Sequence, residues 1–428
     1  MAGGLLAEAD VRRFLAGRTV SELGARITRE GLPIVAILAA GAGARHLGVL
    51  AALATLVGSA AAPWAGVLAD RRRRRPLMVG CDVLRAVALF SIPAAAALHR
   101  LTFWQIAAVT AVVGALTTVF ETADQAWLPQ FVSRNRLAEG NAFVAGASAL
   151  GETGGPTLMG ALFQWIGGPL AIGVDGLSYL ASAWSLLAIR RPEPAPGVAV
   201  EAGRGADAPP ALLDGLWAVA RHPLLRPLAG LMATSSLFGG FFAALYEFYV
   251  LRTLHLTPAV LGLLITSGGV GSLIGAALTA RATRRFGLGP TLLATFAVSA
   301  VATALVPAAP ASFAPAFLCL FGAQFGGDLF ATIFTIAAAT LEQSVTPGDW
   351  LGRVEGALQT LAGGLGVIGA LGAGILAAAA GPRDAFWLAA AGNALATGWL
   401  LSPRLRHLGP RAGDASRWPE AAVAPPGA

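Results

Sequence analysis

A stripe of charged residues lies directly beside an apolar run near the N-terminus. Its members are Arg18, Glu22, Arg26, Arg29 and Glu30. The apolar run from residue 31 to residue 44 is shorter than the ~20 residues that a helix needs to cross a bilayer, so a full span includes part of the stripe. At ~100° per residue the five side chains fall within an arc of ~120°, and Glu22–Arg26 and Arg26–Glu30 have the spacing of i,i+4 ion pairs. We predict that the stripe faces a polar path, where it would carry protons, bind substrate or lock the helices together.

Carboxyl groups also occur inside other apolar segments. The further candidates for proton coupling or for the wall of a cavity are Glu121, Glu152, Asp175 and Asp328. A charge at the centre of a bilayer costs ~2.5–3.5 kcal/mol, so such groups usually face a partner or a cavity. Glu30, Glu152 and Asp328 lie nearest the middle of their segments and are the first candidates for proton exchange. The alternative for each is a permanent buried hydrogen bond or ion pair, which the spacing of Asp82 and Arg85 also allows.

The whole chain has the composition of a membrane protein. Of its 428 residues, 56% are hydrophobic and 12% are charged, whereas a soluble protein has about 25% charged residues. Apolar runs long enough to span ~30 Å of hydrocarbon recur throughout. We therefore predict an all-α polytopic membrane protein with twelve transmembrane helices. The predicted segments are residues 13–41, 47–69, 77–98, 102–127, 137–165, 168–189, 224–251, 258–280, 287–308, 311–341, 352–380 and 384–402.

The twelve segments fall into two halves of six. The predicted parts are an N-terminal six-helix bundle (1–189), a cytoplasmic central loop (190–223), a C-terminal six-helix bundle (224–403) and a cytoplasmic tail that we expect to be disordered (404–428). Most of the 30 basic residues, all of them arginines, lie on the side of the central loop. The positive-inside rule then places both termini in the cytoplasm. LPQFV at 128–132 and LEQSV at 341–345 recur at equivalent places in the halves, as internal repeats of secondary transporters do.

The loop between the second and third segments carries a charged motif. It reads GVLADRRRRRPL, and the positions that matter are Gly66, Asp70, Arg71, Arg74 and Arg75. The motif resembles the signature loop of the major facilitator superfamily, G-x-L-A-D-R-x-G-R-[RK], and departs from it at Arg73, where the family usually has Gly. The resemblance implies two six-helix bundles whose cytoplasmic ends this loop latches together. Pairing of its charges with a helix terminus or with acidic groups explains such a latch physically.

The fifth segment carries a glycine- and proline-rich motif, GETGGPTLMG. Small residues let helices approach closely in lipid, and a proline inside a helix removes a backbone hydrogen bond and bends the helix. The motif resembles the superfamily's antiporter motif through Gly151, Gly155, Pro156 and Gly160, with Met159 in place of a Gly. This resemblance implies export rather than import. The alternative is an ordinary Gly/Pro-rich membrane helix.

Shorter stretches over nearly the whole chain are similar to the macrolide-efflux and enterobactin-exporter branch of the same superfamily. They include SELGARITREGLP (21–33), ETADQAWLPQFV (121–132) and VDGLSYLASA (174–183). The resemblance implies a drug:proton antiporter in a bacterial cytoplasmic (inner) membrane. The chain departs from the pattern in its fourth segment, which has Glu121 and Asp124 but lacks the Arg that many such antiporters carry there.

Together these features predict a secondary active transporter that works by proton antiport and alternating access. It would export amphipathic or hydrophobic small molecules such as drugs, macrolides or siderophore-like compounds. Its expected partners are the small-molecule substrate, protons and the lipid bilayer, and we expect it to act as a monomer. Aromatic candidates for the substrate cavity come from the seventh and tenth segments: Phe242, Tyr246 and Phe325.

Two other functions are alternatives. An uptake permease of the same fold would share the fold and most of the motifs. A non-transporting membrane protein such as an enzyme would need a nucleophile–base or metal constellation, and five histidines near loops or segment ends supply none. Two cysteines in apolar runs indicate no metal site, and no P-loop is present, so we expect no cofactor and no enzymatic activity. Loop arginines account for the net charge of +7 without nucleic-acid binding.

Overall fold

The computed structural model describes residues 8–131, 136–191, 212–406 and 408. Residues 1–7, 132–135, 192–211, 407 and 409–428 are not described. Most of the predicted central loop (190–223) and nearly all of the predicted tail (404–428) therefore lie outside the described residues. Every regular element in the described ranges is helical, as predicted.

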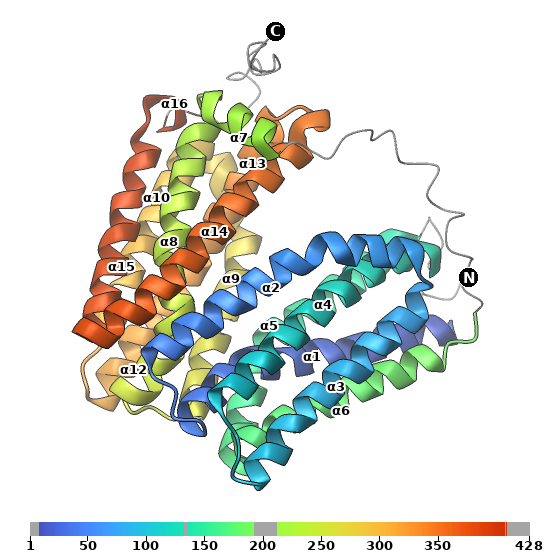
Figure 1. Ribbon diagram of the computed structural model, residues 1–428. Coiled ribbons are helices and arrows are strands. Elements are labelled where there is room, and N and C mark those ends of the chain that lie inside the picture. Colours follow the sequence, from blue (N-terminus) through green and yellow to red (C-terminus); the bar gives the residue numbers. More distant parts are fainter. Residues whose placement is uncertain (1–7, 132–135, 192–211, 407, 409–428) are drawn as a thin grey trace. The chain divides into compact units, whose positions relative to one another are not determined.

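Nine helical segments within the described residues are long and apolar enough to cross a membrane (Figure 1). Each overlaps a predicted segment, which confirms an all-α, multi-pass membrane protein. Their bounds are Ala44–Arg71 (α2), Arg74–Ala97 (α3), Phe103–Gln125 (within α4, Phe103–Phe131), Gly168–Leu187 (α6), Leu225–Thr253 (α8, Leu225–Phe248, with η3, Tyr249–Thr253), Pro258–Phe286 (α9), Leu288–Ala308 (α10, Leu288–Thr303, with α11, Leu305–Ala308), Phe313–Val345 (α12, Phe313–Phe321, with η4, Gly322–Gly326, and α13, Gly327–Val345) and Gly348–Ala380 (α14).

The other three predicted segments are helical but shorter or less apolar. They are α1 (Ala9–Leu38), α5 (Leu137–Ile166) and α15 (Pro382–Ala396). The charged stripe lowers the hydropathy of α1, and several glycines with Glu152 lower that of α5. α15 has 15 residues, which at 1.5 Å per residue is about 22 Å, before the 3₁₀ turn η5 (Thr397–Leu401) extends it. Nine of the twelve predicted spans thus meet the requirement by length and composition alone.

The chain forms two compact units. The first comprises residues 1–205 and 257–266, and the second comprises residues 206–256 and 267–428. In the first unit α1 packs along α5 and α6, α3 packs along α4 and α6, and α2 packs along α4. A hydrophobic cluster around Phe14, Met78 and Trp127 gives α1, α3 and α4 a shared core.

Small residues set the distance between α1 and α6. A Cβ at Gly17 would collide with Ser185, and a Cβ at Gly24 would collide with Ser178. The two helices therefore approach almost to backbone contact, as glycines allow in membrane proteins. This close packing fixes the rotation of α1 and hence the directions in which its charged side chains point.

In the second unit α8 packs along α14 and α15, and α10 packs along α13. Leu228, Phe334 and Leu358 belong to a hydrophobic core that these helices share. A ten-residue helix, α7 (Leu212–Arg221), packs along α14, and a short helix, α16 (Pro403–Arg406), follows η5. α7 falls within the predicted central loop (190–223).

Two π-helical turns interrupt the helices of the second unit. One, η3 (Tyr249–Thr253), continues α8, and the other, η4 (Gly322–Gly326), separates α12 (Phe313–Phe321) from α13 (Gly327–Val345). The predicted segment 311–341 is thus a helix with a π-turn inside it, a feature that the hydropathy pattern did not reveal. π-turns are rare and occur frequently at functional sites.

Candidate functional site

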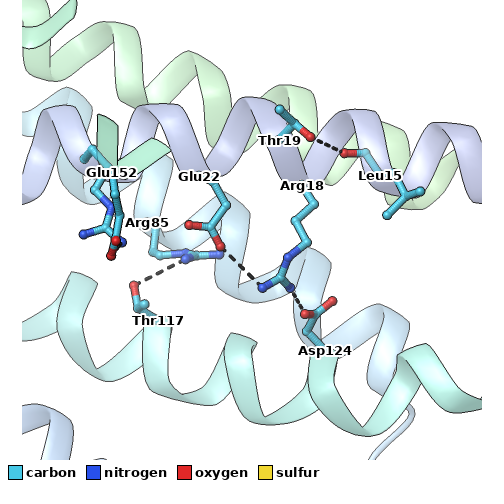
Figure 2. Close-up of polar contacts among 9 residues, drawn as sticks. Leu15, Arg18, Thr19, Glu22, Arg85, Thr117, Asp124 and Glu152 are labelled. Atoms are coloured by element: carbon cyan, nitrogen blue, oxygen red, sulfur yellow. Dashed lines mark hydrogen bonds and ion pairs between the residues drawn. The ribbon is translucent and has the colours of Figure 1, made fainter. Parts of the chain in front are cut away.

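The first residue of the charged stripe, Arg18, joins α1 to α4. Its guanidinium forms an ion pair with the carboxylate of Asp124 on α4, and its Nη2 lies 3.4 Å from Oε1 of Glu22 (Figure 2). The side chains of Arg18 and Asp124 are 12% and 4% exposed. Both charged groups are therefore largely buried, and each offsets much of the cost of burying the other's charge.

A second member of the stripe, Arg26, joins α1 to α5. Its Nη2 lies 2.8 Å from Oε1 of Glu152, a residue 126 positions away in the chain. The spacing along α1 offered Arg26 partners on its own helix, so the partner that the structure gives it corrects that expectation. Glu30 pairs instead with its neighbour Arg29, at 3.1 Å between Oε1 and Nε.

The glycines of the antiporter-like motif bring α5 against α1 beside this ion pair. A Cβ at Gly155 would lie 2.5 Å from Cβ of Arg26, and a Cβ at Gly151 would lie 3.2 Å from the carbonyl oxygen of Glu22. Pro156, inside α5, is buried next to them. The motif thus has a local structural role, because side chains at these two positions would push α5 away from the charged stripe.

The last glycine of the motif, Gly160, packs against a different segment of the first unit. A Cβ there would lie 2.7 Å from the carbonyl oxygen of Pro258, and the hydroxyls of Thr157 and Thr266 lie 2.7 Å apart. Residues 257–266 therefore pack on α5 through small or hydrogen-bonded side chains.

An arginine outside the charged stripe, Arg85 of α3, is buried beside α4 and α6. It forms an ion pair with Asp82, and its Nη1 lies 3.3 Å from the hydroxyl of Thr117 on α4 (Figure 2). Its guanidinium carbon lies 4.1 Å from the ring centroid of Tyr179 and 4.5 Å from that of Phe120. The aromatic faces add cation–π stabilisation to the ion pair, so this arginine is held by contacts from three helices.

Two other predicted carboxyl groups of the first unit have different surroundings. Asp175 of α6 is fully buried, accepts hydrogen bonds from the hydroxyls of Thr28 and Ser178, and forms no ion pair within the described ranges. Glu121 of α4 is exposed and lies within electrostatic range of Glu22 and of three arginines. Asp175 is therefore a hydrogen-bonded interior group. Glu121 is instead an exposed carboxylate beside Glu22 and the three arginines.

Asp328 is the predicted carboxyl group of the second unit. It occupies the first turn of α13, directly after the π-turn η4, and its carboxylate lies against α9 where a Cβ at Gly268 would collide with it. Among the described residues it forms no ion pair. The phenol of Tyr246, on α8, lies within electrostatic range of Asp328, and its hydroxyl is buried without a hydrogen-bond partner in the described part of the chain.

The other two aromatic candidates pack on neighbouring rings. The ring of Phe242 lies 4.9 Å from that of Phe386 between centroids, and Phe325, within the π-turn, stacks on Phe321 at 5.5 Å. Both side chains are half-buried. Tyr246 is thus the only one of the three candidates with a polar atom that these contacts leave without a partner in the described residues.

The signature-like loop is very short. α2 ends at Arg71 and α3 begins at Arg74, so the run of arginines occupies both helix ends and the two residues between them. Nη2 of Arg75 lies 2.6 Å from the carbonyl oxygen of Leu187, near the end of α6. Apart from its own stretch of α2, no atom of the described residues lies within 4 Å of a Cβ placed at Gly66, and Asp70 is half-buried.

The structure brings together charges that sequence reasoning kept apart. The fourth segment lacks an arginine of its own, yet Arg18 and Arg85 reach α4 from α1 and α3 and contact it at Asp124 and Thr117. The i,i+3 spacing of Asp82 and Arg85 indicated their own ion pair within α3 but not the contact of Arg85 with Thr117. Nothing in the sequence marked Asp124 as the partner of Arg18. Within the described residues no group of three or more His, Cys, Asp or Glu side chains could hold a metal ion.

Comparison with known proteins agrees with this arrangement of helices. The chain is 28% identical over 369 residues to the multidrug efflux pump Tap of Mycolicibacterium fortuitum, covering 83% of this chain and 85% of Tap. Its structure is similar to a bacterial homologue of the iron transporter ferroportin in an inward-facing state, with a TM-score of 0.71, 15% identity and coverage of 91% and 97%. The nucleoside transporter NupG matches with a TM-score of 0.69, 11% identity and coverage of 91% and 97%. At these identities the structural likeness shows the fold alone.

The family itself is established by a match to the sequence. The family model of the Major Facilitator Superfamily matches residues 24–251, which is more than half of the chain. Members of this family bind small-molecule substrates within a membrane, and the all-helical, multi-pass fold is the one that the family requires. The chain therefore belongs to the Major Facilitator Superfamily, and it is a transporter rather than an enzyme.

Proposed function

We propose that this transporter exports amphipathic or hydrophobic small molecules in exchange for protons. The observation that carries the proposal is the similarity to the multidrug efflux pump Tap over 83% of the chain. The antiporter-like motif supports it, because Gly151 and Gly155 hold α5 against the charged stripe of α1. The protein works by alternating access as a monomer in a bacterial cytoplasmic membrane, with both termini in the cytoplasm.

We rank the carboxyl groups as candidate proton carriers by the charged groups that contact them. A carrier must be stable both neutral and charged, and an arginine in permanent contact favours the charged form. Asp328 forms no ion pair in the described part of the chain and lies beside a π-turn, so we assign it first. Glu152 and Glu30 follow, because each has one arginine partner that must be released before the group can take up a proton.

In this proposal, part of the substrate site lies near Asp328. Tyr246 offers a buried hydroxyl without a partner among the described residues, and Phe242 and Phe325 offer aromatic surface on the adjoining elements. Ligand sites commonly combine such apolar surface with a few polar groups. In the proposed cycle the loop that contains Gly66, Asp70 and the following arginines adjusts the switch between the inward-open and outward-open states.

Transport assays with neutral variants test the proposal. Cells that produce the wild-type protein should accumulate less of a fluorescent amphipathic dye than cells without it. In proteoliposomes, the pH of the lumen should change when substrate is added. Asp328→Asn should abolish both effects, and Glu152→Gln and Glu30→Gln should weaken them. Asp349→Asn, which changes an exposed residue in the first turn of α14, is the matched control and should leave both unchanged.

Two outcomes would contradict the proposal. Greater dye accumulation in producing cells would identify an uptake permease, and wild-type proton flux in all three carboxyl variants would remove these residues from proton coupling. Membrane expression of each variant has to be measured in parallel, so that loss of transport is not confused with loss of protein.

A further inference from the structure

A pocket of about 470 Å³ opens at one end of the second unit, where α7, the beginning of α8 and η5 meet. Figure 1 shows α7 at this end of the unit. The side chains that matter for its chemistry are Arg221, Arg226, Trp399 and Ser402. None of them belongs to the charged stripe or to the surroundings of Asp328, so the proposed transport function does not account for this pocket.

One wall of the pocket is rigid because α7 is fixed on α14. A Cβ at Gly215 would collide with the carbonyl oxygen of Arg353, so the two helices touch backbone to backbone. Ala218 and Val219, on the same face of α7, are 0% and 4% exposed. Arg221, the last residue of α7, is therefore presented to the pocket from a firmly packed helix.

The corner between α7 and α8 fixes the second arginine relative to the first. The imidazole of His222 is buried, and its Nδ1 accepts hydrogen bonds of 3.3 Å from the backbone N–H groups of Leu224 and Leu225. These contacts hold the chain between the two helices in one conformation. Arg221 and Arg226 consequently lie on the two sides of a defined corner rather than on a mobile loop.

Two exposed tryptophans indicate the depth of the pocket in the membrane. Trp217 and Trp399 are 50% and 45% exposed, and tryptophan side chains are enriched at the membrane–water interface. The ring of Trp399 lies flat on Gly230 of α8, 2.7 Å from the position of a Cβ there, and its Nε1 donates to the hydroxyl of Thr234 at 3.3 Å. Because α8 is a membrane span and the pocket lies at its first turn, the pocket is at the level of lipid headgroups.

The pocket is built to receive a negative charge. Among the described residues, its lining contains the arginines Arg221 and Arg226 and the serine Ser402 and no acidic residue. Arg226 is exposed and forms no ion pair with any residue that the structure describes. The guanidinium of Arg221 lies 4.8 Å from the ring centroid of Trp217, which orients it. Arginine forks match the geometry of phosphate oxygens, and basic pockets beside membrane helices bind anionic lipid headgroups.

We propose that this pocket binds the phosphate of an anionic phospholipid headgroup. Arg221 and Arg226 contact the phosphate, Ser402 donates a hydrogen bond to it, and Trp399 packs against the glycerol end of the lipid. The bound lipid links α7 to the beginning of α8 and to η5, so it stabilises this end of the second unit.

The proposal is tested on the purified full-length protein with phosphatidylglycerol and phosphatidylcholine as probes. Lipid retention is measured by native mass spectrometry during titration. Wild-type protein should retain phosphatidylglycerol in preference to phosphatidylcholine, and Arg221→Gln and Arg226→Gln should each weaken retention ~5-fold, as expected for a basic residue at a charged lipid surface. Arg281→Gln, which removes an exposed arginine of α9 outside the pocket, is the matched control and should have no effect.

A second measurement on the wild-type protein does not depend on variants that fold. In nanodiscs, amides of residues 217–226 should exchange hydrogen more slowly with phosphatidylglycerol than with phosphatidylcholine. Inorganic phosphate at millimolar concentration should not reproduce this protection, because it lacks the glycerol and acyl parts. Equal protection by both lipids, or equal loss of retention in the α9 control, would overturn the proposal. Protection by inorganic phosphate alone would identify a soluble anion as the ligand and would also overturn it.

Discussion

Arg26 on α1 and Glu152 on α5 form an ion pair with 2.8 Å between Nη2 and Oε1, and the two side chains differ sharply in exposure. Arg26 is 14% exposed and Glu152 is 59% exposed. The largely buried side chain of Arg26 is thus held in place, whereas the exposed carboxylate of Glu152 can move away from it. This asymmetry makes the pair a reversible contact between the two helices, in contrast to the pair of Arg18 with Asp124, where both side chains are largely buried.

Neutralising Glu152 should therefore have a small effect on stability. Because the carboxylate is mostly exposed, we expect Glu152→Gln to lower the free energy of unfolding by about 1 kcal/mol or less, while it weakens proton-coupled transport. The measurement is a denaturation midpoint in detergent beside dye efflux in cells. Arg29→Gln, which removes the partly exposed pair with Glu30, is the control for stability alone. A large loss of stability in Glu152→Gln would show that the pair is a permanent structural lock.

Breaking the buried pair should be far more costly. Asp124→Asn leaves the charge of Arg18 without its main partner, and we expect a loss of about 3–5 kcal/mol in unfolding free energy, with Glu22 reducing the loss towards the lower value. Replacing both members by leucine removes both buried charges and should restore much of the stability. Unfolding of the single and double variants in mixed micelles checks this. Equal losses in Asp124→Asn and in the double leucine variant would contradict it.

Two adjacent glycines of α5 provide a matched test of helix packing. The Cβ of Gly155→Ala would lie 2.5 Å from Cβ of Arg26, whereas no described residue outside the same stretch of α5 lies within 4 Å of a Cβ at Gly154. We expect Gly155→Ala to destabilise the protein by about 1–3 kcal/mol through overpacking. Gly154→Ala should be neutral or stabilising by up to about 1 kcal/mol, because alanine favours the helix. Thermal unfolding of both variants in one detergent decides the matter, and similar behaviour would count against the close contact of α1 with α5.

The corner between α7 and α8 should respond to pH. Burial lowers the pKa of the His222 imidazole below its ordinary value, so the folded protein holds it neutral. A group whose pKa is lowered on folding contributes stability above its unfolded pKa of about 6.5, and that stability is lost as the pH falls towards the folded value. Protonation would also remove Nδ1 as the acceptor for the N–H groups of Leu224 and Leu225.

We therefore expect the amides of these two leucines to lose protection from hydrogen exchange as the pH falls from 7 to about 5, after correction for the intrinsic exchange rate. The control is His222→Asn, whose side chain can accept a hydrogen bond but does not titrate in this range. Its protection should not change with pH. A wild-type protein with constant protection over this range would show that the imidazole stays neutral throughout.

Much of the fold could be predicted because span length and hydropathy belong to each segment by itself. The first segment was expected at 13–41 and is observed at Ala9–Leu38, and the other segments agree to a similar degree. The partners of the charges could not be predicted in the same way. Arg26 had acidic residues one turn away on both sides, and it pairs with Glu152 because glycines bring α5 against α1. That choice depends on which helices are neighbours, and a single sequence does not contain this information.

The π-turn Gly322–Gly326 shows a second limit. Glycines permit such a turn but do not require it, and hydropathy is the same whether a segment is α- or π-helical. The sequence identified Asp328 and Phe325 as candidates from their residue types alone. It could not show that one lies within the turn and the other directly after it.

The π-turn also sets the helical register between α12 and α13. Its hydrogen bonds reach from residue i to residue i+5, so it holds one residue more than a regular turn. α12 and α13 are therefore out of step by one residue, as though a single amino acid had been inserted into a continuous helix. Deleting one residue from the turn would rotate α12 by ~100° relative to α13. The direction in which Asp328 points relative to α12 is thus set by the number of residues in the π-turn, and not by the identity of any one of them.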